Sequence, residues 1–266
     1  MDQVTSDDGT TIAYDVQGTG PALILVGGGL DDGTENAPLV PALVGSFTVY
    51  NYARRGRGES GDTWPYQVSR EIEDLAALVI RAGGSAYLYG VSSGGALVLE
   101  AAAAGIPAVR LAVYEVPYNL DPEWPPRWRA YAEEVHAAVA GGRRGDALEA
   151  FMRVTGSPDA EIEGLRSSPY WPAMESLAHT LPYDAACLGP GHPPTDRLAR
   201  IAQPTLVATG DAAKLPDAPD WVRALAPAAD AIAAAIPDAE RQTFEGQSHV
   251  ADPAVIAPAL ELFLRR

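Results

Sequence analysis

A serine flanked by glycines is the strongest chemical feature of the sequence. Residues 90–94 read Gly-Val-Ser-Ser-Gly and lie between a short β-rich run, Ala86 to Tyr89, and an alanine-rich helical pattern, Gly94 to Ala104. A G-x-S-x-G motif in this context forms a tight turn that exposes its serine, because the glycines add no side-chain bulk. The helix that follows would place its positive end at Ser92, where a developing oxyanion is stabilised. We therefore predict Ser92 as a nucleophile; the alternative is a serine that only caps the helix.

A serine nucleophile needs a general base, and the chain contains four histidines. His249 lies in the stretch Gly246-Gln247-Ser248-His249, after the last predicted strand, where a base that follows nucleophile and acid along the chain is expected. His136 lies in a helical, alanine-rich stretch typical of a surface, and His179 and His192 belong to a central helical region. No pair of these histidines has the spacing of metal ligands, so we expect neither a metal nor a cofactor.

Two carboxylates could orient the base, and each follows a predicted strand. Glu115 lies near the end of the apolar run Ala108 to Val116, where an unpaired charge would be costly, and His249 would be its partner. Asp211 follows the next strand, Pro204 to Thr209, after one glycine. We favour Glu115 as the acid. Its alternative role is that of a structural carboxylate bonded to backbone amides of the cap.

Around these residues the chain alternates predicted strands and helices, which indicates a mostly parallel, doubly wound sheet. The strands are expected at 3–14 (a hairpin), 21–26, 47–52, 86–89, 108–116, 204–209 and 241–244, and the helices at 71–82, 94–104, 218–236 and 253–265. A helical segment rich in Trp and Tyr interrupts this alternation between the sixth and seventh strands. It predicts a cap, 117–203, over the carboxyl ends of the strands of a core domain made of 1–116 and 204–266.

Two loops after strands allow more than one interpretation. Gly27-Gly28-Gly29-Leu30 would let the backbone approach a ligand closely, but it lacks the spacing and the Lys-Ser/Thr pair of a phosphate-binding loop. Arg54, Arg55 and Arg57 follow the next strand and could bind an anion. We favour a tight loop in which these arginines pair with nearby carboxylates.

The composition narrows the classes of partner. The chain has 266 residues with 35 acidic and 19 basic side chains, and this balance disfavours nucleic acid and anionic membranes. The single cysteine, Cys187, rules out an internal disulfide and suits a reducing cytoplasm, and we expect it to pack in the cap. No apolar run reaches the length of a membrane span. We expect a cytoplasmic monomer or homodimer that acts on a small molecule.

The chain resembles the α/β-hydrolase fold superfamily over essentially its whole length. The residues that carry the likeness are Leu25 to Leu30, Tyr52 to Asp62, Gly90 to Gly95, Tyr114 to Pro117, Pro204 to Asp211 and Gly246 to His249. The resemblance implies Ser92 as nucleophile, His249 as base, and an oxyanion hole formed by the backbone N–H groups of Ser93 and Gly29. Many members place the acid where this chain has Ala213. A subset that includes fungal zearalenone lactonases is similar to this chain in placing a Glu at the preceding strand end.

The resemblance implies hydrolysis of a carboxylic ester or lactone through an acyl-enzyme. An aromatic cap suits a small apolar or aromatic substrate, and the expected contacts are Leu30, Trp124, Trp128, Tyr183 and Val250. The same Ser92 and His249 could instead serve thioester hydrolysis, carbon–carbon bond hydrolysis or a cofactor-free cyclisation. A non-catalytic binding protein with a decayed triad is a further alternative, favoured only by Ala213. A dehalogenase or epoxide hydrolase is disfavoured, because these enzymes need a carboxylate at the position of Ser92.

Overall fold

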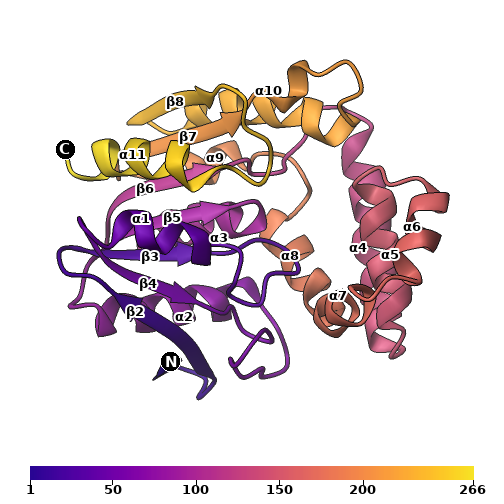
Figure 1. Ribbon diagram of the computed structural model, residues 1–266, viewed down its shortest axis with the longest axis horizontal. Helices are drawn as coiled ribbons and strands as arrows, with labels where there is room; N and C mark the ends of the chain where they lie inside the picture. Colours follow the sequence, from indigo (N-terminus) through magenta and orange to yellow (C-terminus); the bar gives the residue numbers. More distant parts are fainter.

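The computed structural model describes residues 1–266 and contains one eight-stranded sheet between layers of helices (Figure 1). The strands are β1 (Asp2–Thr5), β2 (Thr11–Gln17), β3 (Ala22–Val26), β4 (Thr48–Tyr52), β5 (Ala86–Val91), β6 (Ala108–Tyr114), β7 (Thr205–Gly210) and β8 (Ala239–Phe244). Their order is β1-β2-β4-β3-β5-β6-β7-β8. The pairs β1–β2 and β2–β4 are antiparallel and all others are parallel, which confirms the predicted fold class.

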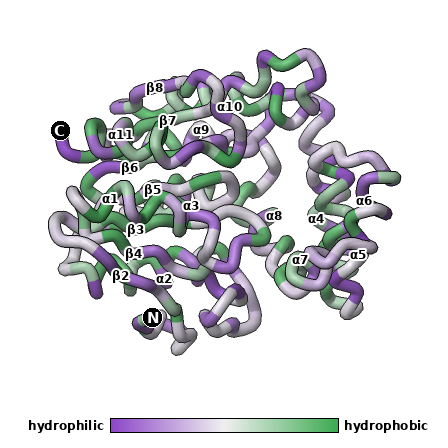
Figure 2. Tube along the Cα trace, viewed as in Figure 1, coloured by the Kyte–Doolittle hydropathy of each residue, from purple (hydrophilic) through white to green (hydrophobic).

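The central strands are apolar on both faces because helices cover both faces. In β3, Ile24 and Val26 belong to a hydrophobic cluster with α2 (Val68–Arg81), α3 (Ser93–Ala103) and α10 (Asp220–Ala235). Leu23 and Leu25 alternate with them and pack against α1 (Val40–Leu43) and α11 (Pro253–Leu264) on the other face. Figure 2 shows the same arrangement, with mainly hydrophobic residues along the strands in the middle of the sheet.

The chain between β6 and β7 is helical, and we call residues 117–203 the cap segment. It contains α4 (Trp124–Ala140), α5 (Arg144–Val154), α6 (Asp159–Arg166), α7 (Trp171–Leu177), α8 (Leu181–Leu188) and α9 (Thr195–Leu198). In Figure 1, α4 to α7 stand beyond the carboxyl ends of the parallel strands, and α8 lies between them and the core helix α3. Short 3₁₀ helices are η1 (Ala37–Leu39), η2 (Ala178–Thr180) and η3 (Ala212–Lys214).

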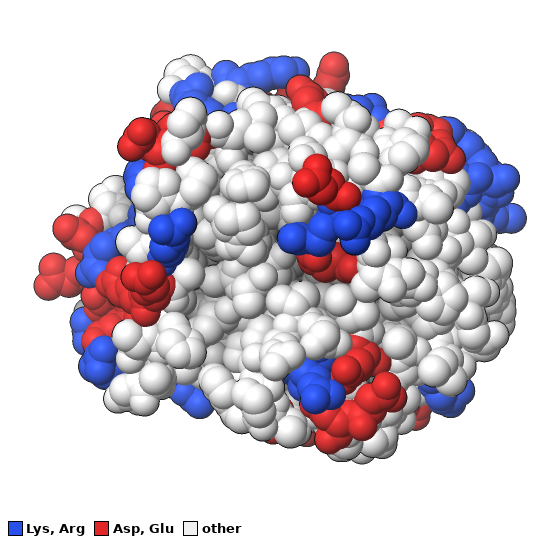
Figure 3. Space-filling view, turned by 180° about the vertical axis from the view of Figure 1, so that it is seen from behind, with Lys and Arg blue, Asp and Glu red and all other residues white.

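One predicted strand ends earlier than expected. β6 stops at Tyr114 instead of Val116, because Glu115 has a φ of 49°, which a strand cannot accommodate. Charged side chains on the face seen in Figure 3 occur in clusters of mixed sign, separated by uncharged surface. None of the helices has both the length and the apolar character that crossing a bilayer requires.

Candidate active site

Ser92 lies in a strained turn between β5 and α3. Its φ of 55° and ψ of −130° are unusual for a residue with a side chain, and such backbone strain costs about 1–3 kcal/mol. The surroundings leave no room for bulk, since a Cβ on Gly90 would lie 2.5 Å from the Gly94 carbonyl oxygen, and one on Gly94 would lie 2.4 Å from that of Gly27. Gly90 therefore lets the start of α3 fold back on the end of β5, and Gly94 lets the first glycine loop pack directly against the serine turn.

His249, in the loop between β8 and α11, contacts the predicted acid. Its Nδ1 lies 2.8 Å from Glu115 Oε2, and Glu115 Oε1 accepts a 2.8 Å hydrogen bond from the Gly210 N–H. The Glu115 side chain is only 3% exposed, so both carboxylate oxygens have the partners that burial demands. The ring of Trp221 packs edge-on to the imidazole, with centroids 5.1 Å apart.

Asp211 forms no hydrogen bond or ion pair with His249 and instead holds the loop that carries His249 in place. Asp211 Oδ1 accepts a 2.8 Å hydrogen bond from the Gly246 N–H, and the Asp211 N–H donates to the Gln247 carbonyl at 3.1 Å. A hydrogen bond from Lys214 lowers the pKa of the Asp211 carboxyl. Of the two candidate acids, the structure therefore places Glu115 against the imidazole.

Ser92 and His249 line one cavity of about 290 Å³ between the sheet and the cap segment. No hydrogen bond joins the Ser92 hydroxyl to the imidazole in this conformation. The predicted residues Gly29, Ser93, Trp124 and Trp128 also line the cavity. The remaining lining residues are Glu35, Pro117, Tyr118, Asn119, Tyr131, Phe151, Val154, Thr155, Asp184, Leu188, Trp221 and Ala224. The walls are thus rich in aromatic rings and contain no lysine or arginine.

Three predicted substrate contacts lie outside this cavity. Tyr183 is buried, stacks on Tyr66 with ring centroids 3.8 Å apart, and donates a hydrogen bond to Asp62. Leu30 lines a separate cleft beside α7, and Val250 is 82% exposed and lines a second cavity that His249 and Glu35 also border. The structure does not bring these three residues to the cavity of Ser92, because sequence does not fix which face of a helix or loop meets the cavity.

Two backbone N–H groups beside Ser92 have no acceptor in the protein. Neither the Gly29 N–H nor the Ser93 N–H donates a hydrogen bond, and both residues line the cavity. Ser93 begins α3, where the first N–H groups of a helix are free and carry a partial positive charge. A Cβ on Gly28 would lie 2.9 Å from the Ser92 Cβ, so the glycine loop borders the serine. The two N–H groups can therefore receive an oxygen atom that becomes negatively charged.

The three arginines after β4 are buried and paired with carboxylates, as their loop context suggested. Arg54 binds Glu71 through two hydrogen bonds of 2.7 Å, and Arg55 binds Asp74 at 2.8 and 2.7 Å. Arg54 and Arg57 both contact one carboxylate oxygen of the cap segment, Asp184 Oδ1, at 2.8 and 2.7 Å. Arg54 and Arg57 thus connect the core to the cap segment, and none of the three arginines lines the cavity.

Sequence reasoning missed two acidic residues of the cavity, Glu35 and Asp184. Glu35 Oε2 accepts a 2.6 Å hydrogen bond from the Gly28 N–H. Desolvation of the carboxyl raises its pKa, although the residue as a whole is exposed and borders a cavity on either side. Asp184 is the only charged residue of α8, and the buried arginines beside it lower the pKa of its carboxyl despite burial. An isolated acid in an apolar helix was the one available signal.

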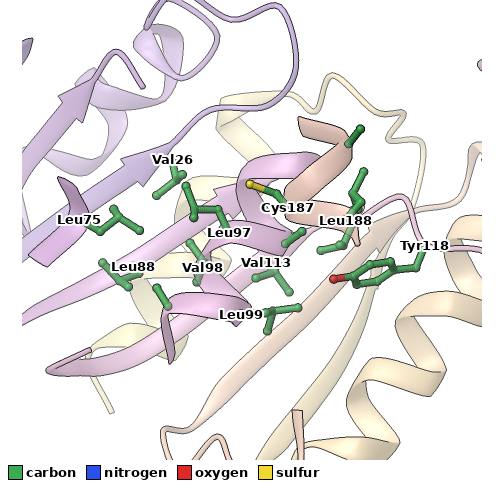
Figure 4. Packing of buried hydrophobic residues seen from close by; sticks show 14 of the residues in the cluster. Val26, Leu75, Leu88, Leu97, Val98, Leu99, Val113, Tyr118, Cys187 and Leu188 are labelled. Carbon is green, nitrogen blue, oxygen red and sulfur yellow. The ribbon is translucent and has the colours of Figure 1, made fainter. Parts of the chain in front are cut away.

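Cys187 packs in the hydrophobic interior, as expected. In Figure 4 Cys187 lies between Leu97 and Leu188 of the buried cluster. Its sulfur is 3.5 Å from the Arg54 guanidinium and 3.5 Å from the Tyr66 hydroxyl. Burial raises the pKa of the thiol to about 12, so the thiolate is scarce at neutral pH. No group of three or more His, Cys, Asp and Glu side chains is arranged to hold a metal ion.

Known proteins resemble this chain in sequence over part of its length and in structure over nearly all of it. The profile of the alpha/beta hydrolase family matches residues 22–259. A curated relative, the uncharacterized hydrolase YraK of Bacillus subtilis (strain 168), is 32% identical over 96 residues. That match spans 35% of this chain and 35% of the relative, about a third of its length.

Solved structures match the whole chain. An alpha/beta hydrolase from Sphaerobacter thermophilus DSM 20745 is 45% identical, with a TM-score of 0.85 over 98% of this chain and 99% of that one. An esterase from Thermogutta terrifontis is 22% identical, with a TM-score of 0.68 over 99% and 97% of the two chains. The enol-lactonase from Burkholderia xenovorans LB400 is 21% identical, with a TM-score of 0.67 over the full length of both. The last two similarities concern the fold alone.

Proposed function

Because this chain belongs to the alpha/beta hydrolase family and is a hydrolase, we propose that it cleaves a carboxylic ester or lactone through an acyl-serine intermediate. One observation carries the proposal: Ser92 in its strained turn and the Glu115–His249 pair border the same cavity. A nucleophile, a base and a buried acid that orients the base are the parts that serine hydrolysis requires.

The proposed reaction has two halves that use the same groups. Ser92 Oγ attacks the carbonyl carbon while His249 takes its proton, and the imidazolium then protonates the leaving alcohol. A water molecule, activated by His249, attacks the acyl-enzyme and releases the acid. Glu115 stabilises the imidazolium, and the free N–H groups of Gly29 and Ser93 stabilise the tetrahedral oxyanion; loss of one such donor typically costs ~10²–10³ in rate.

The walls of the cavity support a proposal for the substrate class. Trp124, Trp128 and Tyr131 offer broad apolar faces, and the absence of a lysine or arginine gives a free carboxylate group no partner. A volume of about 290 Å³ suits a small substrate. We therefore propose a neutral aromatic or apolar ester or lactone. The placement of Glu115 is similar to that in the zearalenone-lactonase-like subset, which supports including lactones.

The argument for a non-catalytic binding protein with a decayed triad no longer applies. It rested on Ala213, which occupies the position of the acid in many family members, whereas here Glu115 contacts His249. Thioesters and activated carbon–carbon bonds would meet the same serine, and a substrate panel must separate them from esters.

The test combines a panel of substrates with active-site labelling. Aryl esters, acyl thioesters and aromatic lactones are offered to the native chain and to Ser92→Ala, and a fluorophosphonate probe reports an activated serine. We expect the native chain to hydrolyse esters or lactones and to be labelled, and Ser92→Ala to do neither while retaining its melting temperature. A native chain that resists the probe and turns over no substrate would refute the proposal.

A further inference from the structure

We propose that Arg57 is a positioning residue for the oxyanion hole, because it fixes the orientation of the Gly28–Gly29 peptide whose N–H faces the cavity. This inference rests on the proposed function, since an oxyanion hole acts only if Ser92 forms a tetrahedral adduct. It concerns a group outside the serine, histidine and glutamate, on a loop that follows a different strand, β4.

The argument begins with the geometry of a single peptide unit. Arg57 Nη1 donates a short hydrogen bond to the Gly28 carbonyl oxygen. In a planar trans peptide the C=O of one residue and the N–H of the next point in opposite directions. A guanidinium on the carbonyl side of Gly28 therefore keeps the Gly29 N–H on the opposite side, where it has no acceptor in the protein and Gly29 lines the cavity.

This peptide needs an external restraint. Gly27, Gly28 and Gly29 have no side chains to pack, and glycine has the widest backbone freedom of all residues. Neighbouring contacts support the same arrangement, because the Gly28 N–H donates to Glu35 Oε2 at 2.6 Å. The positive charge behind the Gly28 carbonyl also polarises the peptide, which makes the Gly29 N–H a better donor.

Arg57 is itself held by a carboxylate that also contacts the second half of the oxyanion hole. Its Nη2 lies 2.7 Å from Asp184 Oδ1, and the same oxygen accepts a 2.7 Å hydrogen bond from the Ser93 hydroxyl. Arg57 thus uses both ends of its guanidinium fork, one on the glycine loop and one on the carboxylate of α8. Through Asp184, the residues that supply the two N–H groups, Gly29 and Ser93, share one buried anchor.

The neighbouring Arg55 provides a matched control. It belongs to the same loop and its side chain is 0% exposed, against 1% for Arg57. Its partners are Asp74, Asp8 and the Arg70 carbonyl, none of which contacts the glycine loop, Ser92 or Ser93. Removing either arginine disrupts a buried ion pair, whereas only Arg57 holds the proposed oxyanion peptide.

The experiment compares Arg57→Met, Arg57→Lys and Arg55→Met with the native chain. 4-Nitrophenyl acetate gives kcat and KM, and phenylboronic acid, whose tetrahedral adduct with serine places an oxygen in the oxyanion hole, gives an inhibition constant. Both methionine variants should melt at lower temperature, but only Arg57→Met should lower kcat, by about 10–100-fold with KM nearly unchanged. The boronate should bind Arg57→Met more weakly by a similar factor.

The other outcomes separate this inference from the proposed function. If Arg57→Met does not fold, Arg57→Lys decides: an ammonium lacks the paired fork, so kcat should fall about 3–10-fold. Native kcat and native boronate affinity in a folded Arg57 variant would overturn the inference, and so would a change confined to KM, while the proposed function would stand. A native chain that neither reacts with a fluorophosphonate nor hydrolyses any ester or lactone would overturn both.

Discussion

Two neighbouring strand ends carry an acid each, and the two acids have different surroundings. Glu115 directly follows β6 and Asp211 directly follows β7, which are parallel neighbours in the sheet. The Glu115 side chain is 3% exposed and contacts His249, whereas that of Asp211 is 19% exposed and contacts Lys214. An acid directly after each of two neighbouring parallel strands therefore does not have the same role in both places.

The direction of the chain after each strand explains the difference. Glu115 has a φ of 49°, and its carboxylate reaches across to the Gly210 N–H at the end of β7. Asp211 has a φ of −120° and leads into η3, and its carboxylate turns to the Gly246 N–H. A Cβ on Gly210 would lie 2.1 Å from the Gln247 carbonyl oxygen, so the histidine loop packs on this strand end. The two acids thus hold one loop from two sides, and only one of them contacts the imidazole.

The largest effect is expected for Glu115→Gln. The amide can still accept the Gly210 N–H, but it offers an N–H to His249 Nδ1 and so favours the tautomer that carries its proton on Nε2. That tautomer cannot take a proton from Ser92, and a comparable change in a serine protease lowers kcat about 10⁴-fold. Steady-state kinetics on an aryl ester measures the loss.

The melting temperature provides the control for this substitution. Glu115→Gln keeps size and shape, so a folded variant with a rate near that of the native chain would show that contact with His249 does not define the acid. Loss of activity in Asp211→Asn instead of Glu115→Gln would reverse the assignment of the two strand ends.

The sequence predicted those features of the site that local rules determine. The turn at Ser92, its glycines and the charge at the end of β6 follow from neighbouring residues, and His249 follows from its place after the last strand. The residues through which the cap contacts the cavity could not be predicted in this way. Tyr183 and Asp184 are adjacent on α8, yet only Asp184 lines the cavity. Successive residues point in directions about 100° apart around a helix, so neighbours in sequence face different surroundings. Glu35 was missed because its contact with Gly28 depends on the path of a loop without regular structure.

Glu35→Gln tests whether charge near His249 matters without direct contact. The negative charge of Glu35 favours the imidazolium, so its removal should lower kcat about 3–10-fold at neutral pH. Desolvation raises the pKa of Glu35 above its usual 4.5, but the residue is exposed and solvent screens its charge, so the effect on stability is small. This small contribution is complete below pH 4.5 and is lost as the pH rises through the raised pKa. The variant should therefore melt like the native chain at pH 4 and at a slightly higher temperature at pH 8. A lower melting temperature of Glu35→Gln than of the native chain at pH 8 would contradict the expected direction of this change in stability.

Tyr114→Phe weakens the attachment of the histidine loop from the side of β6. The hydroxyl donates a 2.6 Å hydrogen bond to the Ser248 carbonyl, next to His249. Its loss should cost about 1 kcal/mol in unfolding free energy and lower kcat less than tenfold, because Glu115 still orients the imidazole. Urea unfolding and ester hydrolysis measure the two effects. A loss as large as that in Glu115→Gln would mean that loop position, more than the acid, limits the rate.

The smallest effect is expected for Asp211→Asn. The amide oxygen can still accept the Gly246 N–H, so only the charge facing Lys214 is lost, and kcat should change by no more than about twofold. The Lys214 hydrogen bond lowers the pKa of Asp211, so its small stabilising contribution is present above the usual value of 3.8 and is lost as the pH falls through the lowered pKa. The native chain should therefore melt slightly higher than the variant at pH 7, and the difference should shrink in high salt, which screens exposed charges. A large loss of kcat with an unchanged melting temperature would place Asp211 in the proton transfer and Glu115 in the structure.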